Sequence, residues 1–235
     1  MVLEALRAGQ SLSAIYVDER ARPTDKLDEL LTLAGRRGVS ILRIPRERLD
    51  AISVTGGHNG VIAEGCPLAL VSLEDALRAR RVAPLWLGFG PDVEPDDLGA
   101  VLRTAAAVGV ETVILPPGGG ALLPASARRI AMGAAEQIRF VRAPLSEGCE
   151  AARRAGFGTV AVGWGEGSQS LHEPSLDGPR LLVFTGLRGG PPGEIERHCD
   201  HVVALHPVRP GATLPLSALV AVALYERERQ AGRRS

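Results

Sequence analysis

The sequence has few aromatic residues and no excess of charge, and both features limit what it can bind. Aromatic residues make up only 3% of the 235 residues, so a platform on which nucleic-acid bases stack is poorly supplied. Basic residues number 27 and acidic residues 27, which argues against a protein that coats nucleic acid through its net charge alone. A local basic face stays open, so nucleic-acid binding has to be argued from motifs.

Paired cysteines and long apolar runs are lacking as well. The three cysteines, Cys66, Cys149 and Cys199, are far apart and odd in number, which argues against a disulfide framework and a zinc site. We interpret them as packing residues and expect no metal. No run of about 18 uncharged apolar residues occurs, and the N-terminus lacks the charged-then-apolar order of a signal peptide. We therefore expect a cytoplasmic protein that does not contact a membrane.

The sequence does contain many apolar residues, 45% of the total, arranged in alternating helix and strand patterns. Residues 1–73 predict a small α/β domain, residues 74–83 a linker and residues 84–235 a second α/β domain with longer elements. In the second domain, short apolar runs between helices predict a mostly parallel sheet with helices on both faces. We expect its strands at 84–89, 111–115, 138–141, 158–164, 180–184 and 201–205, and a last helix over 214–230.

Two glycine-rich loops follow predicted strands. "GWGEGS" (163–168) lacks the third glycine of a dinucleotide-binding loop and is best interpreted as a surface turn. "FTGLRGGPPGE" (184–194) could expose backbone N–H groups to a ligand at the carboxyl end of the sheet. A tight turn that ends the strand and opens a helix explains this second loop equally well.

The stretch "EPDDLGAVLRTAAAVGV" (94–110) predicts a helix with one apolar face and with Asp96 or Asp97 as its cap. Arg103 lies in the middle of this helix. From the residues alone, Arg103 is either a surface ion-pair partner or a site residue.

Seven segments, taken in order, resemble the SpoU (TrmH) family of S-adenosylmethionine-dependent RNA 2′-O-methyltransferases with an added N-terminal domain. They are "VLEALRAG", "GHNGVIAE", "EPDDLGAVLRTAAAVGV", "AMGAAEQIRFVR", "LLVFTGLRGG", "CDHVVALHP" and "TLPLSALVAVALYERERQ". The resemblance implies a C-terminal domain whose last segments form a trefoil knot around the S-adenosylmethionine pocket. It also implies a homodimer, an N-terminal RNA-binding module, and ribosomal or transfer RNA as the substrate.

The resemblance also implies the roles of individual residues. Arg103 falls on the family's catalytic arginine, and Gly99 on a small residue that permits close packing. Ser217 is a second catalytic candidate, although its hydroxyl could equally bond the preceding turn. The walls of the cofactor pocket are expected at Phe184, Thr185, Gly186, Gly190, Leu205 and Leu214. Candidates for RNA contact are His58 and Asn59, which could instead only shape their turn, and the arginines Arg7, Arg36, Arg37, Arg128 and Arg129.

Four positions depart from the family's motifs and keep other functions open. Asp97 stands where an asparagine is expected, Thr185 where a glycine is expected, Leu187 where a glutamate is expected, and Pro215 where a second asparagine is expected. Pro215 also removes one N–H group from the start of the last helix. Methyl transfer to RNA is the leading hypothesis. The alternatives are a catalytically silent RNA-binding or dimerising scaffold and a pocket adapted to another small molecule.

Overall fold

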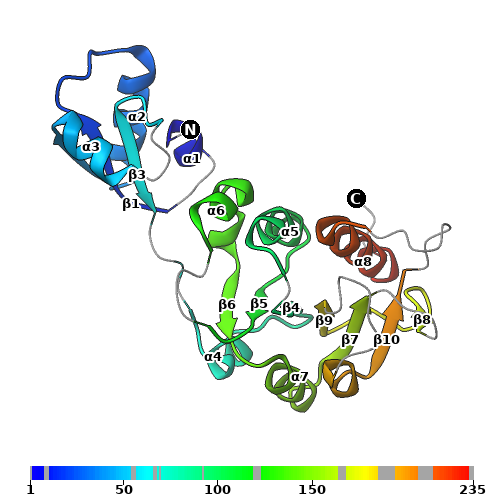
Figure 1. Ribbon diagram of the computed structural model, residues 1–235. Coiled ribbons are helices and arrows are strands. Elements are labelled where there is room, and N and C mark those ends of the chain that lie inside the picture. The colour runs from blue at the N-terminus through cyan, green and yellow to red at the C-terminus, as the bar shows by residue number, and fades with distance from the viewer. Residues whose placement is uncertain are drawn as a thin grey trace. The chain divides into compact units, whose positions relative to one another are not determined.

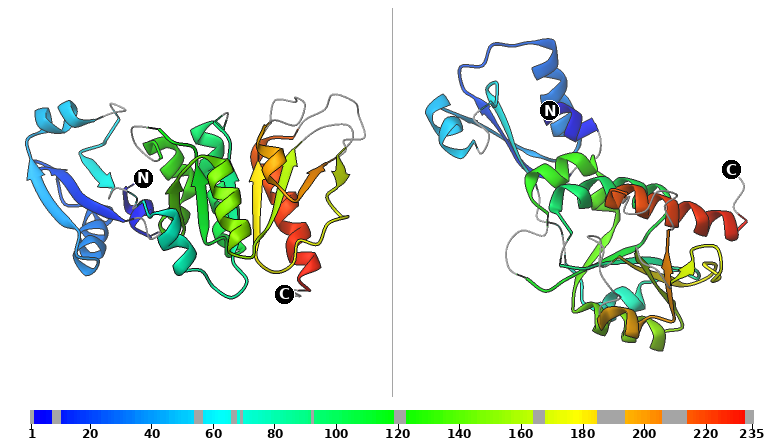
Figure 2. Two further views of the ribbon diagram at one scale, coloured as in Figure 1. Left: turned by 90° about the horizontal axis from the view of Figure 1, so that it is seen from below. Right: turned by 45° about the vertical axis from the view of Figure 1, so that its right-hand side comes forward.

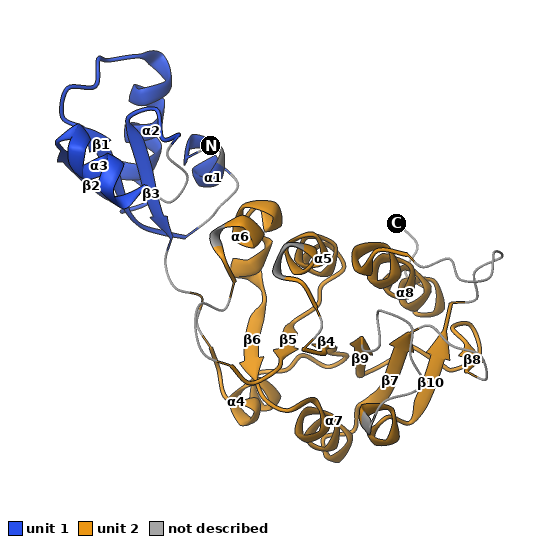
Figure 3. Ribbon diagram, viewed as in Figure 1, with its two compact units in different colours: residues 1–67 blue, residues 68–235 orange. Residues whose placement is uncertain are grey.

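The computed structural model divides the chain into two units, residues 1–67 and 68–235 (Figures 1 and 3). The residues that it describes are 2–7, 11–53, 57–65, 68, 70–91, 93–118, 123–163, 168–184, 194–205 and 214–232. No helix among these residues is long and apolar enough to cross a membrane.

The first unit is a three-stranded sheet with the strand order β2-β1-β3. Strand β1 pairs with β2 in parallel and with β3 antiparallel. Ile15 and Val17 of β1 are fully buried and share a core with Leu30 and Ala34 of α2. The hydroxyl of Thr24 caps α2 by accepting the Leu27 N–H at 3.2 Å. The elements are α1 (Val2–Arg7), β1 (Leu12–Asp18), α2 (Asp25–Arg36), β2 (Ser40–Ile44), α3 (Arg46–Ile52) and β3 (Val61–Gly65).

The second unit contains a seven-stranded sheet with the strand order β6-β5-β4-β9-β7-β10-β8. Every pairing in it is parallel, so all the strands end at one carboxyl edge. The strands are β4 (Leu85–Phe89), β5 (Thr112–Leu115), β6 (Arg139–Arg142), β7 (Gly158–Gly163), β8 (Gln169–Ser170), β9 (Arg180–Phe184) and β10 (His201–Ala204).

Helices cover both faces of this sheet, in two layers that can be followed in Figures 1 and 2. One layer holds α5 (Pro95–Ala107), α6 (Ala125–Ala131), the 3₁₀ helix η1 (Ala134–Gln137) and α8 (Leu216–Gln230). The opposite layer holds α4 (Leu73–Arg78), α7 (Leu145–Arg154) and the 3₁₀ helix η2 (Glu194–His198). Each layer encloses its own apolar cluster, because strands buried on both faces present apolar side chains to both sides.

The predicted architecture is confirmed: both units are α/β, and the second has a parallel sheet between two helical layers. The chain threading expected for a trefoil knot involves residues 185–193 and 206–213, which lie outside the described residues. The boundary between the units falls after residue 67, and α4 occupies much of the expected linker at 74–83. The cause is apolar burial, since Ala76 is fully buried and Leu73 and Leu77 pack against the second unit's core.

The cap expected for the helix over 94–110 is wrong. Helix α5 starts at Pro95, and its N-cap is Glu94, which makes no side-chain capping bond. Proline suits the first helical position because its φ is already helical and it has no N–H to leave unpaired. The helix therefore begins before Asp96 and Asp97.

Candidate functional site

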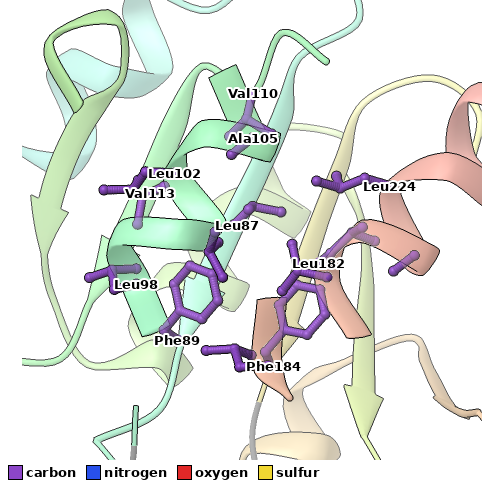
Figure 4. Close-up of a cluster of buried hydrophobic side chains, with 14 of the residues drawn as sticks. Leu87, Phe89, Leu98, Leu102, Ala105, Val110, Val113, Leu182, Phe184 and Leu224 are labelled. Atoms are coloured by element: carbon purple, nitrogen blue, oxygen red, sulfur yellow. The ribbon is translucent and has the colours of Figure 1, made fainter. Parts of the chain in front are cut away.

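The carboxyl edge of the seven-stranded sheet brings together the strand ends that were expected to form a pocket. Phe184 ends β9 and is fully buried. Its ring stacks on Phe89 at the end of β4, with ring centroids 5.6 Å apart and an interplanar angle of 19° (Figure 4). The Gly90 N–H donates to the Phe184 carbonyl at 3.1 Å and ties the two strand ends together. Phe184 thus belongs to the apolar core and packs directly under the carboxyl edge of the sheet.

Two further expected pocket residues flank this edge. Leu205 directly follows β10, is half-buried and packs against the same core cluster. Leu214 precedes Pro215, the N-cap of α8, and leaves 43% of its surface exposed. Thr185, Gly186 and Gly190 lie outside the described residues, as does Leu187.

The first turn of helix α8 has backbone N–H groups that no acceptor within the helix satisfies. Its N-cap is Pro215, which has no side-chain capping bond, and the first intrahelical bonds run from the Ala218 and Leu219 N–H groups to the Pro215 carbonyl. The N–H groups of Leu216 and Ser217 therefore have no acceptor within the helix. Apolar walls with backbone donors and carbonyls at strand ends fit a nucleoside-type cofactor, because main-chain groups can hydrogen-bond an adenine edge.

Arg103 projects from the exposed side of α5, whose opposite side carries the buried Val101, Leu102 and Ala105. Within the described part of the chain, its guanidinium makes no hydrogen bond or ion pair. The surface ion pair that the sequence left open, with Asp97 for example, is therefore not formed there. Ser217 is half-buried in the first turn of α8, and its hydroxyl likewise has no partner among the described residues.

Gly99 holds α5 unusually close to α6. A Cβ atom at Gly99 would lie 2.5 Å from the carbonyl oxygen of Ala127 and 3.0 Å from the Cβ of Ile130. Only glycine permits this approach, because backbone atoms of α6 occupy the space of a side chain. Gly99 thereby fixes the position of the helix that carries Arg103.

The structure separates the candidates for RNA contact in the first unit. His58 is buried, and its Nδ1 accepts the Gly60 N–H at 3.0 Å while Nε2 lies 2.8 Å from a carboxylate oxygen of Asp50. Its role is therefore to shape the turn. Asn59 is exposed at the tip of that turn with a φ of 49°. Arg7 pairs with Glu29 at 2.6 Å.

Arg128 and Arg129, adjacent in α6, also differ from each other. Arg128 is largely buried and pairs with Glu136 of η1 at 2.7 Å. Arg129 is exposed and has no partner among the described residues. Arg128 is thus part of the packing between α6 and η1, whereas Arg129 remains available to a ligand.

A polar network at the end of α8 was not found from the sequence. Glu226 is buried and accepts two hydrogen bonds from Arg229 and one from Gln230. The bonds from Arg229 lower the pKa of Glu226 to about 2. Gln230 also accepts the Leu176 N–H at 2.7 Å. This network fastens α8 to the segment before β9, and the helical spacing of charges alone gives no sign of that distant partner.

A second unforeseen contact lies between α7 and η2. The sulfur atoms of Cys149 and Cys199 are 4.0 Å apart, and both are free thiols. Both are at least partly buried, as expected for packing residues, whereas Cys66 lies outside the described residues. Next to them, Asp200 accepts bonds from the backbone N–H and the hydroxyl of Thr159, at 2.8 and 2.9 Å.

Among the described residues, no cluster of three or more His, Cys, Asp or Glu side chains could hold a metal ion.

Comparison with known proteins places both units. A family model described as RNA 2′-O ribose methyltransferase substrate binding matches residues 1–69, and one described as SpoU rRNA Methylase family matches residues 93–225. The 23S rRNA (guanosine-2′-O-)-methyltransferase RlmB of Pseudomonas putida is 33% identical over 92% of this chain and 88% of its own. A tRNA/rRNA methyltransferase of Mycolicibacterium smegmatis, itself uncharacterized, is 32% identical over 97% of this chain and 74% of its own.

Solved structures share the fold at lower identity. The SpoU methyltransferase AviRb from Streptomyces viridochromogenes, in complex with the cofactor AdoMet, superposes with a TM-score of 0.73 at 21% identity and covers 99% of this chain and 88% of its own. An rRNA methyltransferase from Sinorhizobium meliloti gives a TM-score of 0.71 at 21% identity, over 97% and 83% of the two chains.

Proposed function

Because the chain belongs to the SpoU rRNA methylase family, we propose that it transfers a methyl group from S-adenosylmethionine to a ribose 2′-hydroxyl of ribosomal or transfer RNA. The observation that supports this most strongly is that the substrate-binding and methylase parts both match, in the order of the family and over most of the chain. An RNA-modifying role agrees with the expected cytoplasmic location.

The described residues supply the walls and the backbone groups of the proposed cofactor site. Leu205 and Leu214 flank it, Phe184 supports it, and the N–H groups of Leu216 and Ser217, which have no acceptor among the described residues, are donors for polar atoms of the ligand. S-adenosylmethionine supplies the electrophilic methyl group when it is bound. We assign Thr185, Gly186 and Gly190 to the same site on the family's pattern alone.

We assign Arg103 as the catalytic residue. Methyl transfer requires the ribose oxygen to lie in line with the methyl group and to lose its proton as the new bond forms. The Arg103 guanidinium has no carboxylate partner among the described residues, so its N–H donors are available to the ribose oxygen. Donation to that oxygen stabilises the negative charge that develops on it, and the hydroxyl proton passes to solvent water. Ser217, in the first turn of α8, is the second polar side chain assigned to the site.

We further propose that two copies associate through the outer side of α8. Val222 and Tyr225 lie on that side with 39% and 73% of their surfaces exposed. Together with the half-buried Ala218 and Ala221, they form an apolar stripe on a helix that is otherwise packed into the core. Sedimentation of the full chain tests this: a dimer that Tyr225→Glu converts to a monomer supports it, and a monomeric wild type contradicts it.

Titration calorimetry and a methylation assay test the proposed reaction. The full chain should bind S-adenosylmethionine and S-adenosylhomocysteine in the micromolar range and transfer labelled methyl groups to an RNA transcript. Arg103→Ala should lower kcat at least about 100-fold and leave cofactor affinity within about twofold, because the side chain acts on the reacting oxygen. Arg197→Ala is the matched control, since Arg197 is also exposed and unpartnered in the described part but lies in the opposite helical layer. Unchanged turnover in Arg103→Ala would reject the assignment.

A scaffold without catalysis is the second candidate function, and specific residues favour it. Asp97 and Pro215 replace amide side chains of the family's motifs, and Pro215 caps α8 without a side-chain hydrogen bond. The same calorimetry separates the candidates, because a scaffold shows no binding at millimolar cofactor.

A further inference from the structure

One end of the three-stranded sheet gathers three segments that are far apart in the sequence. Strands β1 and β2 are parallel, so the chain leaves both at the same edge, and the antiparallel β3 starts there. Two hydrogen bonds join the segments: Asp18 N–H to the Gly60 carbonyl at 2.8 Å and Glu19 N–H to the Ile44 carbonyl at 3.0 Å. We call residues 18–22, 43–48 and 57–60 the arginine edge.

The arginine edge presents several guanidinium groups that are not engaged by any described residue. Arg20, Arg22, Arg43 and Arg48 are exposed, and none has a side-chain partner within the described residues. Arg46 alone is engaged, with its Nη1 atom 3.6 Å from the buried carboxylate of Asp18. An unengaged guanidinium keeps all five N–H donors, in a planar fork that matches two phosphate oxygens.

The backbone beneath these side chains is held in place before any ligand arrives. Asp18 accepts the Arg20 N–H on its carboxylate at 2.9 Å and the Ala21 N–H on its carbonyl at 3.0 Å. On the neighbouring turn, the Gly60 N–H donates to Nδ1 of His58, so the ring proton sits on Nε2 and is donated to Asp50. A rigid edge loses little conformational entropy on binding. His58 thus holds the turn that carries the exposed Asn59, and the bond from Asp18 to Gly60 joins this turn to the segment that carries Arg20.

Acidic and basic side chains are mixed on this surface. The mixture favours short-range contacts between single arginines and phosphates over long-range attraction by a net positive charge. Glu19 and Glu47 are exposed at the same edge, and Asp25 and Asp28 lie in the first turn of α2. The arginines are therefore mixed with carboxylates, which agrees with the zero net charge of the chain. The arginine edge also contains no Phe, Tyr or Trp, so it has no platform for splayed bases and suits the backbone of folded RNA.

We infer that the arginine edge binds the phosphate backbone of the RNA substrate, with Arg20, Arg43 and Arg48 contacting phosphates and Asn59 contacting an adjacent ribose or base edge. This inference rests on the proposed function and specifies how the first unit holds the substrate. The inference does not extend to Arg36 and Arg37. These two arginines lie at the end of α2, near the start of β2, and hence at the opposite edge of the sheet.

The test is salt-dependent binding of the full chain to a 23S rRNA transcript. Arg20→Ala/Arg43→Ala should weaken binding at least about tenfold at 0.1 M salt. It should also reduce the slope of log K against log salt by about 1.5, since each lost phosphate contact removes roughly 0.7–0.9. The matched control is Arg36→Ala/Arg37→Ala, which removes two arginines that are also exposed and have no partner within the described residues. This control should change affinity less than about twofold. Arg20→Lys/Arg43→Lys keeps the charges and should restore most of the slope.

Methyl transfer measured in parallel separates this inference from the proposed function. The Arg20→Ala/Arg43→Ala variant should raise KM for RNA and leave kcat unchanged. If the wild type methylates RNA but this variant binds RNA as well as the wild type does, the arginine edge is overturned and the proposed function stands. Equal losses in the two double alanine variants overturn it too, because they indicate a general charge effect. If RNA binding depends on Arg20 and Arg43 but no methyl is transferred, the inference holds and the proposed reaction fails.

Discussion

Replacing Gly99 by alanine should force α5 and α6 apart. The added Cβ would meet the Ala127 carbonyl oxygen at 2.5 Å, whereas ordinary contacts begin at 3.4 Å, so the backbones must separate locally by about 0.9 Å. The Cα of Ala127 and the Cβ of Ile130 obstruct the same space at 3.0 Å. These are atoms of the helix itself, so a side-chain rotation cannot relieve the clash.

Two opposing effects set the size of the change. Alanine is a better helix former than glycine, which favours the variant by about 1 kcal/mol. Overpacking in a closely packed core costs about 1–3 kcal/mol and more when backbone has to move. Because backbone has to move here, we take the cost as about 2–4 kcal/mol and expect a net loss of about 1–3 kcal/mol in the free energy of unfolding of the second unit. Arg103 lies one helical turn beyond Gly99, so methyl transfer should fall about tenfold or more as α5 shifts.

Urea unfolding, monitored by tryptophan fluorescence, measures the loss of stability in the second unit. Both tryptophans, Trp86 and Trp164, belong to residues 68–235, so the signal reports the second unit alone. Gly148→Ala is the matched control, because its Cβ would meet only the terminal methyl of Ile114, at 2.9 Å. A flexible side chain can turn away, so this control should stay within about 1 kcal/mol of the wild type.

A Gly99→Ala protein as stable as the wild type would refute the reasoning. It would mean that α5 and α6 have room for a side chain at this position and that the glycine does not set their distance. A loss of stability in Gly148→Ala equal to that in Gly99→Ala would refute it as well, since the argument depends on the difference between backbone and side-chain obstruction.

Three further predictions concern the polar contacts of the second unit. The ionised form of Glu226 is favoured in the folded state, since its pKa of about 2 lies below the ordinary value of 4.5. The ionised carboxylate should therefore contribute about 1–3 kcal/mol to stability above pH 4.5, and this contribution should be lost as the pH falls toward 2. Glu226→Gln should flatten that part of the curve of stability against pH. Asp200→Ala should cost about 1–3 kcal/mol in urea unfolding, because it leaves the N–H of the buried Thr159 without its side-chain acceptor, and an unchanged midpoint would contradict this. The hydrogen bond with Cys149, together with burial, raises the pKa of Cys199, so iodoacetamide at pH 8 should label Cys199 at least about tenfold more slowly than in the urea-unfolded chain, as read by peptide mass spectrometry.

The strands and helices of the second unit could be predicted because their sequence patterns are local. Runs such as "RLLVF" and "ETVIL" are apolar on both faces, which is typical of a strand buried between two helical layers, and both are strands in the structure. The first turn of α5 was predicted wrongly, since the choice between Glu94, Asp96 and Asp97 as cap depends on where Pro95 sits. The expected linker failed for a different reason: Ala76 is buried by a core to which distant segments contribute.

The candidate site could be predicted only in part. Arg103 was proposed through its motif, and its exposure and its lack of a carboxylate partner among the described residues are properties of the packed helix. Phe184 was expected to line a pocket and instead packs inside the core, because β9 pairs directly with β4 and brings Phe89 against it. His58 shows the same limit, since its partner Asp50 belongs to another element.

The sequence by itself determined the family, because its motif segments resemble those of the SpoU methylases. It also determined the order of the two units and the alternation of elements, because these depend on which residues are apolar and how they are spaced. Only the tertiary structure decided which charged groups are engaged. Arg7, Arg46 and Arg128 pair with carboxylates, while Arg20, Arg43 and Arg103 have no partner within the described residues. An ion pair depends on distances of a few ångströms between side chains, and those distances are set when the chain folds and brings remote segments together.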